Sequence, residues 1–314
     1  MTHTSGRSSS ALPALAAAGS ALFMGTIGPI AAYSGLRPET VTFFRLLLGW
    51  VFMSLFILLR GKRSTLKIGF SPALLASGVF LAGFIVVYIQ AMRFTTMANA
   101  IVTIYLAPLA ASAGAHFLFG EKLSRRSVLL IGLALGGFLM LREFDLGFGG
   151  SGNDFSWRGT LLALAAMVFY SLYILANRII PREIHVFSRT WYQFLTGSLV
   201  MLPFFLLRPE PVSPAAFGWL LAAGLVPGFL AILLAVTALD SLPAAVFGTL
   251  AYMEPITVMV LGWVLFGQSL SALQLAGSAV IIGCGIIRAL IPEGARPAES
   301  PSPASAGTNE ASSG

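Results

Sequence analysis

The chain has 314 residues, of which 57% are hydrophobic and only 10% are charged, and its formal net charge is +7 at pH 7. A soluble globular protein carries about 25% charged residues, so this composition excludes an ordinary soluble domain and indicates a chain embedded in a lipid bilayer. The single cysteine, Cys284, excludes a disulfide framework and a cysteine-based metal cluster.

Apolar stretches long enough to cross the hydrocarbon layer occur ten times along the chain. One crossing needs about 20 helical residues, and continuous apolar runs favour helices over the alternating strands of a barrel. We therefore predict an all-α integral membrane protein with ten transmembrane helices. Spans one to ten are expected at 11–35, 41–59, 72–92, 97–119, 125–141, 158–177, 188–207, 215–239, 243–266 and 271–291.

The net positive charge first suggests a nucleic-acid partner, but the basic residues follow the membrane topology instead. With both termini inside, thirteen of the lysines and arginines fall in inner segments and five in outer segments, while Arg45 lies within a span. This asymmetry obeys the positive-inside rule. We expect a multi-pass protein of the plasma membrane with cytoplasmic termini and no nucleic-acid partner.

A pattern of tyrosine, proline and a Leu-Phe-Gly triplet occurs twice, 147 positions apart. The first copy starts with Tyr105 and Pro108 and the second with Tyr252 and Pro255. A weaker likeness links Phe44–Arg45 through Gly49 with Tyr192–Gln193 through Gly197. A duplicated membrane domain with prolines at corresponding positions is typical of secondary transporters.

The duplication predicts two five-helix repeats. An odd number of spans in each half means that the halves are inverted relative to each other in the membrane. The first repeat is expected at 11–146, an outer linker at 147–157 and the second repeat at 158–291. Residues 1–10 would form a cytoplasmic tail, and the Pro/Ser/Ala/Gly-rich segment 292–314 is expected to be disordered.

Two segments carry the repeated pattern in full, YLAPLAASAGAHFLFGEKLS at 105–124 and YMEPITVMVLGWVLFGQSLS at 252–271. With these segments the sequence resembles the EamA-type, ten-helix branch of the drug/metabolite transporter superfamily, over about residues 11–291. The resemblance implies a central cavity lined mainly by spans one, three, four, six, eight and nine, with spans five and ten at the periphery. The two copies differ at Ala107, where the second copy has Glu254, and at Gln268, where the first copy has Glu121.

Glu254 lies about eleven residues into the ninth span, near the middle of the bilayer. A charged side chain costs about 2.5–3.5 kcal/mol at that depth on insertion scales, so we expect it to face the protein interior or water. It could contact an amine of the substrate or couple transport to protons. Alternatively, it could pair with an arginine, or bond backbone groups freed by Pro255, in a purely structural role.

Pro108 and Pro255 each remove a helical hydrogen bond and expose a carbonyl group one turn earlier. Their matching positions predict a cavity between spans four and nine at this level, with Tyr105, Tyr252 and Glu254 nearby. The other interpretation is that the two kinks only aid packing.

The remaining candidates for substrate or coupling contacts are polar side chains within spans, each with a packing alternative. Arg45 could bind a carboxylate, reach the outer surface or pair with an acidic neighbour. His116 could relay protons or be structural. A tyrosine face on span six suits an organic cation or zwitterion, and consists of Tyr170, Tyr173 and Asn177. Small residues at Gly132, Gly136 and Gly283 predict close helix contacts, with a homodimer left open.

No phosphate-binding loop, metalloprotease motif or catalytic triad occurs in a plausible setting, so we expect no enzyme activity, no cofactor and no metal. A phosphorylated substrate is disfavoured, because Arg45 is the one clear cation within a span. We predict a secondary active transporter that moves small organic metabolites across the lipid bilayer by alternating access. Amino acids, amines or amphipathic drugs are the expected small-molecule substrates, with export favoured and proton coupling left open. The alternative is a non-transporting receptor or scaffold on the same fold.

Overall fold

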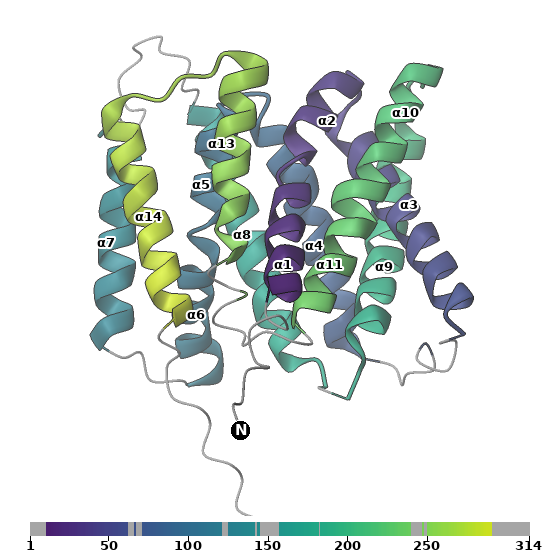
Figure 1. Ribbon diagram of the computed structural model, residues 1–314, viewed down its shortest axis with the longest axis horizontal. Helices are drawn as coiled ribbons and strands as arrows, with labels where there is room; N and C mark the ends of the chain where they lie inside the picture. Colours follow the sequence, from purple (N-terminus) through teal and green to yellow (C-terminus); the bar gives the residue numbers. More distant parts are fainter. Residues whose placement is uncertain are drawn as a thin grey trace, which may run out of the picture.

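The computed structural model describes residues 11–61, 66, 71–120, 125–141, 143–144, 157–181, 183–239, 247 and 250–290. Every regular element among these residues is helical (Figure 1). The two predicted tails and nearly all of the predicted linker lie outside the described residues.

The described residues of the first repeat form seven α-helices, because two of its predicted spans are interrupted. Span one is broken at Gly25–Thr26 and span four at Tyr105–Leu106. In chain order the helices are α1 (Ala11–Met24), α2 (Ile27–Ser34), α3 (Pro38–Leu59), α4 (Pro72–Ala91), α5 (Met97–Ile104), α6 (Ala107–Phe119) and α7 (Arg125–Leu141).

The second repeat has its main irregularity in span eight, where a π-helix around Pro227 lies between two α-helices. A single turn of π-helix inside an α-helix is frequent at functional sites. In chain order the helical elements are α8 (Trp157–Ile179), α9 (Val186–Leu207), α10 (Pro214–Ala223), η2 (Gly224–Leu230), α11 (Ala231–Leu239), α13 (Met253–Phe266) and α14 (Ala272–Leu290).

In the described part of the chain, seven helical segments are long and apolar enough to cross a membrane. They correspond to predicted spans one, two, three, four, six, seven and eight, and they run over Leu12–Ser34, Pro38–Leu59, Pro72–Ala91, Met97–Phe119, Trp157–Ile179, Val186–Leu207 and Pro214–Ala238. Three shorter apolar helices, Val128–Leu141, Met253–Phe266 and Ala272–Ile287, lie where spans five, nine and ten are predicted. The all-helical membrane fold is thus confirmed, while ten complete crossings remain a prediction.

The Leu-Phe-Gly triplet of each repeat ends a helix. Gly120 follows α6 and Gly267 follows α13, and both have positive φ angles, 66° and 62°. This left-handed conformation is the usual helix C-terminal stop, and it favours glycine because a Cβ atom is strained there. The duplicated sequence signature therefore encodes a duplicated helix end.

Helices α3 and α9 make reciprocal contacts that relate the two repeats. A Cβ atom on Gly49 of α3 would lie 3.0 Å from the ring of Phe194, and a Cβ atom on Gly197 of α9 would lie 2.9 Å from Leu46. Leu46 and Phe194 occupy corresponding positions of the repeats, as do Gly49 and Gly197. In Figure 1, α3 runs downward, whereas the corresponding helix of the second repeat, α9, runs upward. Likewise, α5 and α6 run downward, whereas their counterpart α13 runs upward.

Helices α7 and α14 pack against each other at one edge of the molecule, as expected for spans five and ten (Figure 1). Their backbones meet where a Cβ atom on Gly277 would collide with the carbonyl oxygen of Gly137. Close contacts within the chain are not found at Gly132, Gly136 and Gly283, because a Cβ atom on any of the three would have no described heavy atom within 4 Å. Gly132 and Gly136 are exposed, whereas Gly137 is buried, so the contact lies on a different face of the helix from these two glycines. A homodimer contact at the three glycines stays a prediction.

Candidate functional site

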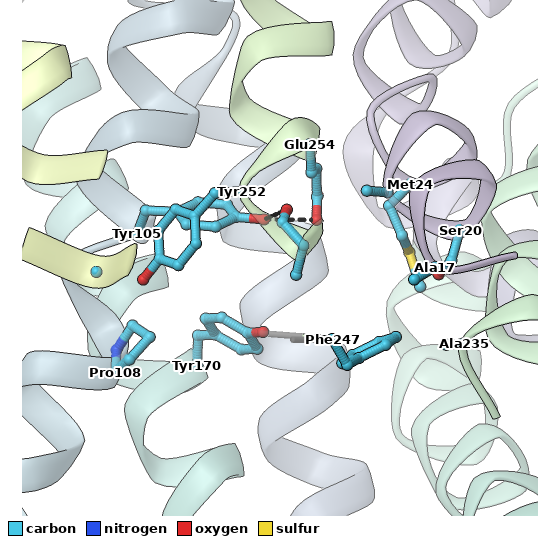
Figure 2. Close-up of a pocket in the computed structure, with 13 residues that line it drawn as sticks. Ala17, Ser20, Met24, Tyr105, Pro108, Tyr170, Ala235, Phe247, Tyr252 and Glu254 are labelled. Carbon is cyan, nitrogen blue, oxygen red and sulfur yellow. Dashed lines mark hydrogen bonds between the residues drawn. The ribbon is translucent and has the colours of Figure 1, made fainter. Parts of the chain in front are cut away.

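Two adjoining cavities occupy the centre of the helix bundle. The first, which we call the proline cavity, has a volume of about 320 Å³ (Figure 2). It is lined by Ala17, Ser20, Ala21, Met24, Tyr105, Pro108, Tyr170, Ala235, Phe247, Ala251, Tyr252, Glu254 and Gly285. The second, the arginine cavity, has a volume of about 310 Å³ and contains Arg45 and Gln193. Glu254, Tyr105 and Tyr170 line both cavities, so this group lies at their junction.

The lining comes from both repeats. Spans one, three, four, six, eight and nine all contribute, as the family resemblance implies. Span two adds Arg45, span seven adds Thr190, Gln193 and their neighbours, and α14 adds Gly285. Helix α7 supplies none of the residues that line either cavity.

Glu254 lies in the first turn of α13, next to the break that precedes this helix. Pro255 has no N–H group, so the carbonyl oxygen of Ala251, one turn earlier, loses its usual helical donor. The hydroxyl of Tyr105 lies 3.0 Å from this oxygen and 2.9 Å from Glu254 Oε2. The structural alternative for Glu254 was a bond to the freed backbone or to an arginine. In the structure, the Tyr105 hydroxyl from the other repeat lies between the carboxylate and the freed carbonyl.

Tyr105 and Tyr252 occupy corresponding positions of the repeats but have different surroundings. Their rings are tilted by 60° with centroids 5.0 Å apart. Tyr105 reaches toward Glu254, whereas the Tyr252 hydroxyl points to the opposite side (Figure 2). It lies against Gly285 of α14, where a Cβ atom would overlap with it. Tyr105 is therefore the repeated tyrosine that contacts the carboxylate.

Arg45 is buried, with an exposed fraction of 8%, and does not reach the membrane surface. Its Nη2 donates to the carbonyl oxygen of Pro227 in the π-helix at 3.3 Å and lies 3.7 Å from Met24 Sδ. Helix α3 and η2 approach closely here, because a Cβ atom on Gly228 would lie 3.2 Å from the carbonyl oxygen of Arg45 itself. The arginine cavity thus combines one cation, Arg45, with one anion, Glu254.

Aromatic rings from α4 and α8 form one wall of the arginine cavity. Phe84 stacks on Tyr170 at 4.7 Å, and Tyr170 stacks on Tyr173 at 6.0 Å. Tyr88 stacks on Phe84 at 6.0 Å, and its buried hydroxyl has no hydrogen-bond partner among the described residues. A ring face attracts a cation, and the open hydroxyl can bind a polar ligand group. The tyrosine face predicted on span six is therefore part of a larger aromatic surface.

Like Tyr88, Gln193 is one of the polar lining residues that sequence reasoning missed as site candidates. Its Nε2 donates to Ser77 Oγ and to Asn177 Oδ1, both at 2.9 Å, and its Oε1 accepts from Tyr173 at 3.3 Å. The internal repeat could have identified Gln193, because it occupies the position in the second repeat that corresponds to Arg45 in the first. Among the predicted candidates, Asn177 belongs to this network rather than to the cavity surface.

Two other candidates do not line either cavity. Pro255 is buried and acts through the carbonyl that it frees. His116 lies in the last turn of α6, edge-on to the ring of Phe117 at 5.1 Å, and is absent from the residues that line the cavities. The structure therefore brings together Arg45, Tyr105, Pro108, Tyr170, Tyr173, Tyr252 and Glu254. Among the described residues, no group of three or more His, Cys, Asp or Glu side chains could hold a metal ion.

Comparisons with known proteins connect this architecture to transporters. A protein of Archaeoglobus fulgidus named as an uncharacterized transporter is 26% identical over 265 residues, which cover 84% of this chain and 91% of the relative. The pseudopaline exporter CntI of Pseudomonas aeruginosa is 25% identical over 255 residues, covering 80% of this chain and 86% of CntI.

A solved crystal structure with 22% sequence identity aligns with a TM-score of 0.60, over 88% of this chain and 95% of that chain, and supports the fold alone. The profile of one family matches the chain twice, at residues 11–142 and 157–289, in agreement with the two repeats. The chain belongs to the EamA-like transporter family.

Proposed function

We propose that the protein is a secondary active transporter of the plasma membrane that exports small organic molecules carrying an amino group. Amino acids, amines, and those zwitterions and amphipathic drugs that have an amino group form this class. Ten transmembrane helices in two inverted repeats would alternate access to the central cavities. The observation that carries the proposal is the pair of opposite charges, Arg45 and Glu254, which face one cavity with an aromatic wall.

The charges and rings complement a small zwitterion. Glu254 would accept hydrogen bonds from a substrate ammonium group, and Arg45 would bind its carboxylate. Tyr170 and Tyr173 offer ring faces for the cationic or apolar part of the substrate. A phosphorylated substrate fits less well, because Arg45 is the single cation among the described residues that line the two cavities.

Interrupted helices around the cavities support alternating access. Spans one and four are broken at Gly25–Thr26 and Tyr105–Leu106, η2 interrupts span eight, and α13 begins beside the cavity. Transporters built from inverted repeats place discontinuous helices at the substrate site and rock one half against the other. The proposed direction, export, is supported by the relative named as an exporter.

A flux screen in proteoliposomes tests this proposal. Labelled amino acids, amines and one sugar phosphate would be loaded separately, with and without an imposed pH gradient, and compared with protein-free vesicles. We expect protein-dependent flux of at least one amino-bearing compound and none of the sugar phosphate. Transport of the sugar phosphate alone would contradict the assigned substrate class. Ligand binding without flux of any compound would favour the receptor alternative.

A further inference from the structure

The hydroxyl of Tyr105 faces two acceptors with a single proton. Glu254 Oε2 lies at 2.9 Å and the carbonyl oxygen of Ala251 at 3.0 Å. A phenolic O–H group can donate one full hydrogen bond and can also accept. With an ionised carboxylate, the proton of Tyr105 must be shared between the two oxygens or given to one of them.

A proton on Glu254 changes this arrangement without leaving any group unpaired. The protonated carboxyl group can donate to the Tyr105 oxygen across the same 2.9 Å, and Tyr105 then donates to Ala251 alone. A substrate ammonium group at Glu254 has a similar effect, because it satisfies the carboxylate and releases the tyrosine proton. In both the protonated and the ammonium-bound state, the Tyr105 hydroxyl needs the Ala251 carbonyl oxygen as its acceptor. Pro255 has no N–H group, so this oxygen has no helical donor and stays available.

The arrangement joins the two repeats and exists on one side only. Tyr105 belongs to the first repeat, whereas Glu254 and Ala251 belong to the second. At the corresponding place, Ala107 replaces the carboxylate, and the Tyr252 hydroxyl lies against Gly285 instead. The hydrogen bond that Tyr105 makes across the two repeats to Glu254 therefore depends on the protonation of a single side chain.

The other charged and titratable groups around Glu254 do not compete for this role. Arg45 of α3 faces the same cavity, as do the hydroxyls of Tyr88 from α4, Tyr170 from α8 and, in the proline cavity, Tyr252. Among the described residues, those that line the cavities include no second carboxylate, lysine or histidine. Glu254 is therefore the carboxyl group available to a proton that reaches the described lining of the cavities.

We propose that Tyr105 is a positioning residue that switches its hydrogen bond from Glu254 to the Ala251 carbonyl when a proton or a substrate ammonium group occupies the carboxylate. The inference rests on the proposed transport site. It adds that binding of a proton or an ammonium group at Glu254, in the second repeat, changes the hydrogen bond made by Tyr105, in the first repeat.

Infrared difference spectroscopy of the reconstituted full-length protein tests the switch with the proton as the probe. Spectra would be recorded between high and low pH, with ring-deuterated tyrosine used to assign tyrosine bands. We expect a protonated-carboxyl band that disappears in Glu254→Gln, together with a tyrosine band that disappears in both Glu254→Gln and Tyr105→Phe. Tyr252→Phe is the matched control and should keep both bands, because its hydroxyl does not contact Glu254.

The possible results separate cleanly. A tyrosine band that survives in Tyr105→Phe, or a Glu254 band with no accompanying tyrosine band, overturns the switch. Absence of a Glu254 band over the whole pH range in which the protein stays folded overturns it too. Should Tyr105→Phe fail to fold, Glu254→Gln alone decides, because the tyrosine band must then vanish with the carboxyl band. None of these readouts requires transport, so the switch can fail while the transport function stands.

A flux measurement examines the consequence for coupling. In Tyr105→Phe, pH-gradient-driven flux should fall relative to substrate exchange by on the order of tenfold, the scale of one hydrogen bond to a charged group. A general loss of folded protein would lower both fluxes equally and leave their ratio unchanged. An unchanged ratio in a folded Tyr105→Phe protein contradicts the proposed role.

Discussion

Corresponding residues of the two repeats carry different chemistry, although the scaffold around them is duplicated. Arg45 in span two corresponds to Gln193 in span seven, and Glu254 in span nine corresponds to Ala107 in span four. Arg45 binds the carbonyl oxygen of Pro227, whereas Gln193 binds side chains of α4 and α8. A symmetric fold thus encloses an asymmetric site, with its cation and its anion contributed by different repeats.

The contribution of a single buried residue can be tested at Gln193, because its side-chain amide donates two hydrogen bonds and accepts one from its neighbours. Replacing it in Gln193→Leu should lower the free energy of unfolding by about 2 kcal/mol, since Ser77 and Asn177 lose a buried donor. Thermal unfolding in detergent would measure the loss. A double-mutant cycle with Asn177→Ala provides the control, because residues in one network should show non-additive effects. Strictly additive losses would show that the network contributes no coupling.

Prolines and glycines determine where the helices break, end and approach one another. Pro108 lies at the start of α6 and Pro255 near the start of α13, beside the cavities. Gly120 and Gly267 end the same two helices in the left-handed conformation. Gly49 and Gly197 allow α3 and α9 to cross closely at the interface between the repeats. The repeated small residues therefore specify a repeated geometry even where the polar residues have diverged.

The packing of α7 against α14 can be tested with two glycines of the same helix. Gly277→Ala should destabilise the protein by about 1–3 kcal/mol, because its methyl group collides with the backbone of α7. Gly283→Ala is the matched control and should be neutral or slightly stabilising, since its methyl group meets no described atom and alanine favours a helix. Equal melting temperatures for the two variants would contradict the described contact.

The sequence alone was sufficient for the class of fold. Helices that cross a bilayer need long apolar runs, and the duplicated pattern indicates two structural repeats. It also located Glu254, Tyr105 and the tyrosines of span six, since polar groups within spans are costly and few. It did not give the partner of Glu254, which depends on how two segments 149 positions apart meet. The Gln193 network was likewise missed, because it depends on contacts between helices rather than on local pattern. The π-helix was missed although Pro227, which lies inside it, was visible in the sequence.

Orientation in the membrane is a property of the whole molecule, and the inner excess of lysine and arginine predicts it. The start of α1 and the end of α14 lie on the same side of the bundle (Figure 1). In a background that lacks Cys284, a cysteine introduced after Leu66 should react only from the cytoplasmic side. One introduced after Phe148 should react only from the outside. Labelling of both positions from one side would refute the ten-span topology.

Transport by Glu254→Gln in proteoliposomes tests the central claim most directly, namely that substrate and coupling proton meet at the cavities around Glu254. The amide mimics the protonated carboxyl group and cannot release a proton. We predict that pH-gradient-driven flux is abolished, whereas exchange of substrate across the membrane is weakened but still measurable. Exchange needs no net proton movement, and the amide oxygen of glutamine still accepts a hydrogen bond from the substrate ammonium group, although without the charge of the carboxylate. Loss of both modes in a folded variant would instead assign Glu254 to substrate binding alone. Full gradient-driven transport by a stably folded Glu254→Gln protein would contradict the account.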